Sequence, residues 1–233
     1  MVVSASDYKK TFLKLLDDPS LVPESQREKI RTAAVSQGIF TVYLGLNISN
    51  EALNGCLRAF SVYDNALDQD VDYEKADDPD HFSKVPLGVY SPSLVNPALA
   101  PQGKSSLMIQ AVCPDRWQEN WHRDDRQKYR ELKDRVKATL IERAERIVPG
   151  LRQSVEFEDA ATPLTYERYT QNTDGATSAW SWDPRKKFYE GDMMKMSVET
   201  PVKNLLIGSC WVAQIGGLPS ALAAAYLCAK KIK

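Results

Sequence analysis

The sequence predicts a mixed α/β fold of the α+β type, with a mixed β-sheet covered by helices. Apolar residues at every second position between 40 and 48 indicate a strand with one buried face. Apolar residues at every third or fourth position between 124 and 148 indicate a long amphipathic helix that lies on the sheet. The remaining strand and helix signals are separate segments along the chain, which is typical of this fold class.

The composition is that of a globular protein. The 233 residues are 43% apolar and 26% charged, which is enough to bury a core and excludes both disorder and a minimal disulfide scaffold. A net charge of −1 gives no electrostatic footprint for nucleic acid, so no nucleic-acid partner is expected. Four widely spaced cysteines without a CxxC pair or a secretory signal favour a reducing compartment, and the cytoplasm is the default localisation.

The chain opens with signals for a strand and two helices. Residues 2–3 are β-branched and indicate the end of a strand, and either Ser6 or Asp7 caps the helix that follows. An apolar stripe predicts that this first helix ends near Pro19. A second helix is predicted over 23–38, with proline in its first turn and glycine as its stop.

The middle of the chain supplies the remaining elements of the predicted substrate domain. Further strands are expected at 57–63, 85–90 and 105–112, which with 40–48 make a sheet of at least four strands. After the long helix we expect extended segments at 154–158 and 165–170 and a long loop or lid at 172–199. The charges of the long helix are interpreted as its outer face, with a binding surface as the alternative.

Most common catalytic and metal-binding patterns are absent from the sequence. Between positions 64 and 80 the sequence has eight acidic residues and a single basic residue, Lys75, which indicates a solvated loop. A calcium-binding loop is the alternative, but the order of ligands that such a loop requires is missing. The histidines are His81 in that acidic loop and His122 at the start of the charged helix, and GxSxG is absent, so a hydrolase is disfavoured. No metal site and no catalytic residue are predicted. Neither GxGxxG nor GxxxxGK[ST] occurs, so a complete nucleotide-binding βαβ unit is not encoded.

The last 30 residues form the pattern that stands out. The stretch 205–229 has no charge and is long enough to cross a bilayer, but its polar residues, glycines and proline divide it into a strand, a glycine-rich turn and a helix. Gly216 and Gly217 would let a ligand approach the backbone, and the helix start would offer N–H groups to it; an ordinary turn is the alternative. Its small and apolar residues predict that this helix is buried on most sides.

Several short motifs, taken in order, support a resemblance to a known family. They are Val-Val-Ser-Ala-Ser-Asp (2–7), Phe-Thr-Val-Tyr-Leu-Gly-Leu (40–46), Val-Tyr-Ser-Pro-Ser (89–93), Ala-Pro-Gln-Gly-Lys (100–104), Leu-Ile-Glu-Arg-Ala-Glu (140–145), Pro-Gly-Leu (149–151), Thr-Pro-Leu-Thr-Tyr-Glu-Arg-Tyr-Thr (162–170), Gly-Ala (175–176) and Gly-Gly-Leu-Pro (216–219). On these residues the sequence resembles the C-terminal portion of the phytoene desaturase family of FAD-dependent oxidoreductases, which includes carotenoid isomerases and retinol saturase-like enzymes.

The resemblance implies a division of the chain and a set of cofactor contacts. Residues 1–20 and 197–233 would be a partial, Rossmann-like FAD-binding domain that lacks its first βαβ unit, and 21–196 would be the substrate-binding domain. Gly208 and Ser209 would lie along the ribityl and pyrophosphate of FAD. The flavin would be approached by Gly216, Gly217, Leu218, Pro219, Ser220 and Ala221. The family commonly has a strongly polar residue after Gly208, whereas this sequence has Ser209 and Cys210.

The resemblance also implies a function. The intact enzyme would use FAD for redox chemistry or isomerisation of double bonds in an apolar, isoprenoid-like substrate, and Trp180, Trp182 and Tyr169 are candidates for the wall of a substrate tunnel. We expect this fragment to be inactive and colourless without an N-terminal FAD-binding half. Association with a membrane surface and dimerisation of the fragment stay open. A non-catalytic binding or scaffold module that kept the fold without flavin is the alternative.

Overall fold

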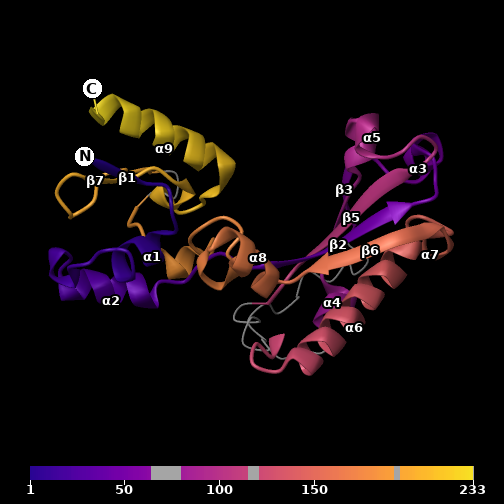
Figure 1. Cartoon of the computed structure of the whole chain (residues 1–233), viewed down its shortest axis with the longest axis horizontal. Helices are drawn as coiled ribbons and strands as arrows, with labels where there is room; N and C mark the ends of the chain where they lie inside the picture. The colour runs from indigo at the N-terminus through magenta and orange to yellow at the C-terminus, as the bar shows by residue number, and fades with distance from the viewer. Residues whose placement is uncertain (64–79, 115–120, 192–194, 233) are drawn as a thin grey trace. The chain divides into compact units, whose positions relative to one another are not determined.

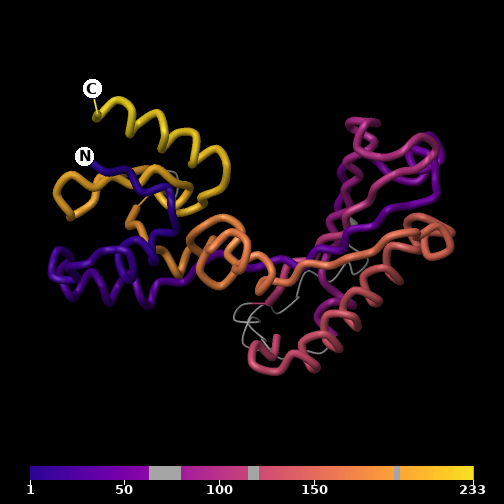
Figure 2. The backbone as a smooth tube through the Cα atoms, in the orientation of Figure 1, coloured from indigo at the N-terminus to yellow at the C-terminus, as the bar shows by residue number. Residues whose placement is uncertain are grey.

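The computed structural model describes residues 1–63, 80–114, 121–191 and 195–232. Contacts divide the chain into residues 1–37 with 166–233, called unit 1, and residues 38–165, called unit 2. Both chain termini lie in unit 1 (Figure 2). These units are defined by contacts, and they do not test the predicted division into cofactor and substrate domains. Within the described residues, no helix combines the length and the apolarity that crossing a membrane requires.

Unit 2 is built on a five-stranded antiparallel sheet. Its strands are β2 (Ile39–Leu46), β3 (Phe60–Tyr63), β4 (Leu87–Tyr90), β5 (Ser105–Val112) and β6 (Val155–Ala161). They lie in the order β3-β4-β5-β2-β6, so the most strongly alternating segment, β2, pairs on both sides (Figure 1). Together with the helices, this sheet confirms the predicted α+β class and the strands expected around 40–48, 57–63, 85–90 and 105–112. Its described pairings are all antiparallel, whereas a mixed sheet was predicted.

One face of this sheet is covered by α6 (Arg126–Glu145) (Figure 1). The helix begins where the carboxylate of Asp125 accepts hydrogen bonds from the N–H groups of Gln127 and Lys128. Leu132, Val136 and Leu140 follow at intervals of four residues, and they pack with the buried alternate residues of the strands into one core. The 3.6-residue period therefore gives α6 the face that it buries.

Short helices connect these elements, and one of them corrects a prediction. They are α3 (Asn50–Cys56), α4 (His81–Lys84), α5 (Pro92–Val95), α7 (Leu151–Ser154) and α8 (Pro163–Thr170). The extended segment predicted at 165–170 is wrong, because it lies in α8. Thr162 accepts a hydrogen bond from the N–H of Thr165, and Pro163 suits a first helical position, so a local cap outweighs the strand propensity of the threonines and tyrosines.

Unit 1 brings together the two ends of the chain. Strand β1 (Val2–Ser4) pairs in parallel with β7 (Leu205–Ile207). Its helices are α1 (Tyr8–Leu13), α2 (Glu24–Thr32) and α9 (Gly217–Ile232). Asp7 rather than Ser6 caps α1, because its side chain accepts a hydrogen bond from the N–H of Lys10 at 2.8 Å.

The second predicted helix is too long at its C-terminal end. Helix α2 ends at Thr32 instead of continuing to Gly38. Residues 34–36 are extended against the segment around Trp180: Ser181 N–H donates to the Ala34 carbonyl and Ser36 N–H donates to the Ala179 carbonyl. These partners are more than 140 residues away in the sequence, so no local pattern predicts the end of this helix.

The described residues of the predicted loop, 172–191 and 195–199, have little regular structure, as predicted, but they contribute to the core of unit 1. The fully buried ring of Trp180 stacks on Phe188, with 3.8 Å between ring centroids. Tyr8 and Trp211 pack against the Trp180 ring edge-on. The segment is therefore a structural part of unit 1, and aromatic rings provide much of the apolar burial there.

Candidate functional site

The candidate site lies where β1 and β7 end. Because the two strands are parallel, their carboxyl ends lie at the same edge, which is where ligands bind in open α/β sheets. The N–H of Gly208 donates to the Ser4 carbonyl at 2.8 Å. The hydroxyl of Ser209 donates to the Ser6 carbonyl at 3.1 Å. The structure thus brings two of the predicted cofactor residues together with the end of the first strand.

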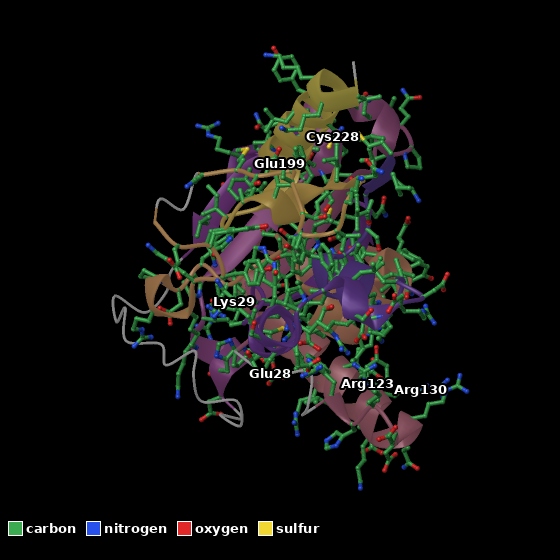
Figure 3. The ribbon with its side chains drawn as sticks, turned by 90° about the vertical axis from the view of Figure 1, so that its left-hand side faces the viewer. Glu28, Lys29, Arg123, Arg130, Glu199 and Cys228 are labelled. Carbon is green, nitrogen blue, oxygen red and sulfur yellow. The ribbon has the colours of Figure 1, made fainter. Side chains whose placement is uncertain are left out.

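Gly208 is explained by packing within the fold. A Cβ atom at this position would lie 2.5 Å from Cγ1 of Val3 and 3.7 Å from the sulfur of Cys228. Cys228 lies on α9 (Figure 3), and its thiol donates to the Ile207 carbonyl at 3.5 Å. Gly208 therefore allows α9 and the two strands to pack closely.

The glycine pair before α9 accommodates a backbone carbonyl. A Cβ atom on Gly216 would lie 1.4 Å from the carbonyl oxygen of Ser178, and the N–H of Gly217 donates to that same oxygen at 3.0 Å. Both glycines have positive φ, +54° and +76°. A Cβ atom on Gly217 would meet only Cδ of Pro219, at 3.8 Å, so the space beside Gly217 is open.

The start of α9 offers fewer free donors than its sequence suggested. The N–H of Gly217 is bonded to Ser178, and Pro219 has no N–H, so Leu218 and Ser220 carry the remaining donors of the first turn. Leu218 and Pro219 are exposed, Gly217 and Ala221 are half-buried, and the Ser220 side chain is buried. The Gly217–Pro219 corner is accessible and fits the approach of a flat cofactor, whereas Ser209 and Gly216 already contact other parts of the chain.

Gln214 holds the turn between β7 and α9, and sequence reasoning missed it. This fully buried amide accepts hydrogen bonds from the N–H groups of Phe188 and Tyr189 at 2.9 and 3.2 Å. It donates to the Ser181 carbonyl at 2.6 Å. A single glutamine in an otherwise apolar stretch was the available signal, because a buried amide requires hydrogen-bonding partners.

The three aromatic residues considered as tunnel walls have different environments. Trp180 is buried in the core of unit 1, and its indole N–H donates to the Trp211 carbonyl at 3.0 Å. Trp182 and Tyr169 are exposed. The indole N–H of Trp182 donates to the Ile215 carbonyl at 3.1 Å, directly before the glycine pair. Trp180 thus packs the core, and Trp182 lies next to the candidate site.

Helix α9 is buried along one face only, which corrects the prediction that it is buried on most sides. Ser220, Ala224 and Cys228 form its buried face. Leu218, Leu222 and Tyr226, spaced four residues apart, are each more than 60% exposed. Val2 is exposed as well, on a strand that among the described strands pairs only with β7. Sequence pattern identifies an apolar helix, but not which faces find a partner.

Unit 2 presents a second apolar surface, on the sheet face opposite α6. Directly paired residues share a face, so the register sets its composition. The open face combines Phe60 and Val62 of β3, Gly88 and Tyr90 of β4, Ser106, Met108 and Gln110 of β5, Thr41, Tyr43 and Gly45 of β2, and Phe157, Asp159 and Ala161 of β6, and of these Thr41 and Ala161 are buried. Phe60, Val62 and Phe157 are each more than 60% exposed. Contiguous exposed apolar surface is typical of sites that bind a ligand, a membrane or another protein.

The remaining candidate groups do not form a reactive cluster among the described residues. His81 begins α4 instead of lying in an acidic loop, and its buried ring contacts the Val112 carbonyl through Nε2 at 2.8 Å. Burial raises the pKa of the Cys113, Cys210 and Cys228 thiols, which lowers their reactivity. No described group of residues could hold a metal ion. Residues 64–79, with most of the acidic stretch, lie outside the described part of the chain.

Comparisons with known proteins agree with this fold. No family model matches the chain. All-trans-retinol 13,14-reductase of Danio rerio is 27% identical over 229 residues, which cover 89% of this chain and 35% of that protein. Prolycopene isomerase 2, chloroplastic, of an Oncidium hybrid cultivar is 32% identical over 85 residues, which cover 36% of this chain and 14% of that protein.

This chain is a homologue of these phytoene desaturase-like oxidoreductases. An inactive all-trans-retinol 13,14-reductase of Danio rerio is 23% identical over the whole chain. An oxidoreductase from Methanosarcina mazei shares the fold, with a TM-score of 0.51 over 99% of this chain and 42% of that one, at 13% identity. The expected resemblance is thus confirmed, and the chain spans somewhat more than a third of the length of the two reductases.

Proposed function

We propose that the chain supplies the substrate-binding domain and the closing cofactor-contacting edge of a FAD-dependent oxidoreductase. Its reaction would be redox or isomerisation of double bonds in an apolar, isoprenoid-like molecule. The observation that carries the proposal is the parallel β1/β7 pair followed by the accessible Gly217–Pro219 corner, in a homologue of an all-trans-retinol 13,14-reductase. Residues 1–20 and 197–233 belong to the cofactor domain in this proposal, and 21–196 belong to the substrate domain.

When bound, FAD would supply the hydride-transfer chemistry, and the chain would position the cofactor and exclude water. Gly217 leaves open space beside its Cα, so a flat ring can approach the backbone there. The N–H groups of Leu218 and Ser220 point from the positive end of α9. Four further predicted residues would act indirectly, because they set the geometry of the turn and of the helix start: Gly208, Ser209, Gly216 and Ala221.

The open face of the unit 2 sheet supports an apolar substrate. Its tyrosine, methionine, valine and phenylalanine side chains provide apolar area, and the carboxylate of Asp159 lies on its edge strand β6. Gly45 and Gly88 each add no side chain to this face, so a long, thin molecule can approach the backbone at these two positions, between the side chains of their paired neighbours. We place the intact protein in the cytoplasm at a membrane surface, since such substrates dissolve in lipid.

The proposal includes a partner segment that carries a strand–GxGxxG–helix unit. The exposed stripe of Leu218, Leu222 and Tyr226 and the unpaired edge of β1 are apolar surfaces that such a unit could cover. It would also hold the ADP half of FAD at its own helix start. The alternative is that a second copy of this chain covers the same stripe, forming a homodimer. The oligomeric state in solution distinguishes the homodimer from the strand–GxGxxG–helix partner.

Flavin titration tests the proposal. We expect the chain alone to bind no FAD, and the chain joined to a strand–GxGxxG–helix unit from a homologous reductase to bind it stoichiometrically. In that assembly, Gly217→Leu should reduce flavin occupancy because its side chain fills the open corner. Gly191→Leu is the control, since Gly191 also has positive φ and open space around it but lies outside the site. Stoichiometric FAD binding by the chain alone would refute the need for a partner, and unchanged occupancy in Gly217→Leu would refute the site.

A non-catalytic binding module is the second candidate function. One relative is named an inactive reductase, and Ser209 and Cys210 replace the strongly polar residue expected after Gly208. A module of this kind would bind an apolar ligand on the unit 2 sheet without flavin. Saturable retinol binding by an assembly that binds no FAD would favour the module, and it would count against the oxidoreductase.

A further inference from the structure

Unit 1 contains an open cavity whose lining residues do not include the Gly217–Pro219 corner. Its volume is about 740 Å³, within the range typical of small-molecule sites. Helix α2 forms one side and the segments 188–190 and 195–197 form the other. It is lined by Ser25, Gln26, Lys29, Phe188, Tyr189, Glu190, Lys195, Met196 and Ser197. None of these residues belongs to the site proposed for FAD.

The charged side chains that line the cavity carry net positive charge. Lys29, which Figure 3 labels on α2, and Lys195 contribute two ammonium groups, and Glu190 contributes one carboxylate. Neither lysine forms an ion pair with a described carboxylate. The acids on α2 have other partners: Glu24 pairs with Arg27, and Glu28 pairs with Arg31. The hydroxyls of Ser25 and Ser197 and the amide of Gln26 add hydrogen-bond donors. Together, these lysines and hydrogen-bond donors are suited to an anionic group.

The lining also has an apolar part, in which contacts with the rest of unit 1 hold the two aromatic residues in place. Phe188, Tyr189 and Met196 form this part. The Tyr189 hydroxyl donates to the Trp211 carbonyl at 2.8 Å, and Gln214 accepts from the N–H groups of both aromatic residues. One face of the Phe188 ring is stacked on Trp180, and the Lys29 ammonium lies 5.3 Å from the ring centre. No Phe188 face is left for a nucleobase, so the wall suits an aliphatic chain.

We propose that this cavity binds an amphiphilic anion, that is, a carboxylate or phosphate group attached to a short apolar chain. Lys29 and Lys195 would bind the anionic group, with the hydroxyls of Ser25 and Ser197 as additional donors. Met196 and the edges of Phe188 and Tyr189 would contact the chain. The proposal does not depend on flavin binding, because no residue is shared between the two sites.

Calorimetric titration of the full chain with three probes tests the proposal. Decanoate has both the charge and the chain, inorganic phosphate has only charge, and decanol has only the chain. We expect saturable decanoate binding that is at least about tenfold tighter than that of either other probe, a difference of ~1.4 kcal/mol. Equal binding of phosphate would refute the apolar wall, equal binding of decanol would refute the anion site, and no decanoate binding would refute the proposal.

Charge variants localise the binding to the cavity. Lys29→Gln and Lys195→Gln should each weaken decanoate binding about tenfold, as expected for loss of a charged hydrogen bond. Glu190→Gln should tighten it, because it removes a like charge. The control is Lys203→Gln, an exposed lysine of unit 1 that does not line the cavity. If Lys203→Gln weakens binding as much as the cavity variants do, overall charge rather than this cavity accounts for the affinity, and the proposal is wrong.

Discussion

The two units reach a packed core by different means. Unit 2 is one continuous stretch, and its core comes from alternating strand residues and the apolar stripe of α6. Unit 1 joins residues 1–37 to 166–233, and its core depends on particular contacts: the stacked ring of Trp180, the buried amide of Gln214 and the glycine pair against Ser178. Aliphatic packing spreads stability over many residues. We therefore expect unit 1 to depend on a few positions and unit 2 to tolerate single changes.

The strongest test of this difference is Gly216→Ala. The added Cβ would lie 1.4 Å from the Ser178 carbonyl oxygen at a residue with φ of +54°, so the turn must move or unit 1 must open. We expect a loss of about 3 kcal/mol or more in the free energy of unfolding of unit 1. Hydrogen exchange should increase in β7 and stay unchanged in β5, and this would be measured by mass spectrometry on peptides from each strand.

Gly191→Ala is the matched control for that variant. Gly191 has φ of +87°, but a Cβ atom there meets nothing within 4 Å. Only the cost of the left-handed backbone remains, about 1 kcal/mol. Equal losses in the two variants would mean that the Ser178 contact is unimportant, and equal exchange in both units would remove the distinction between them.

A second test uses pH. Burial raises the pKa of Tyr8 in the core of unit 1 from 10.0 to about 12, and burial also raises the pKa of Tyr189. Since the unfolded tyrosine ionises first, the contribution of Tyr8 is complete below pH 10.0 and is lost as the pH rises through about 12. The full loss is on the order of 2 kcal/mol.

Thermal unfolding in mildly and strongly alkaline buffer measures this effect. Tyr8→Phe should remove part of the alkaline destabilisation, and Tyr8→Phe combined with Tyr189→Phe should remove more. Exchange in β5 reports on unit 2 in the same samples. The comparison between units fails if alkaline opening begins in β5, or if the double variant loses stability as steeply as the unmodified chain.

The smallest expected effect is Ile109→Val in unit 2. Ile109 is fully buried in β5, so the change removes one methylene from the sheet core. We expect a loss of about 1 kcal/mol confined to unit 2. Ile30→Val is the counterpart in unit 1, where Ile30 is also fully buried. Denaturant titration of both variants tests whether equal deletions cost equal amounts, and a much larger loss for Ile109→Val would contradict the tolerance expected of unit 2.

Predictions from the sequence succeeded where the pattern is local. Strand β5 was predicted with both of its ends, β2 within two residues of its ends and α6 within three, because their periodicity follows directly from the buried face. They failed at residues 14–18, because the first helix already ends at Leu13 instead of near Pro19. They also failed at residues 33–38 and 165–170, where a distant bridge to Trp180 and a threonine cap decided the conformation. In the candidate site, the order of strand, glycine turn and helix was predicted. The partners of Gln214 were not, since they are 25 to 33 residues away.

The sequence by itself determined the principal strands and the long helix of unit 2, the glycine-rich turn before α9 and the family to which the chain is related. Only the tertiary structure decided that residues 2–4 pair with 205–207, that Ser178 fills the space above Gly216, and that Leu218, Leu222 and Tyr226 stay exposed. The physical reason is the sequence separation over which each kind of information acts. Periodicity encodes which side of a segment is apolar, whereas the segment that covers it, or leaves it open for a ligand, is chosen by contacts between residues that are far apart in the chain.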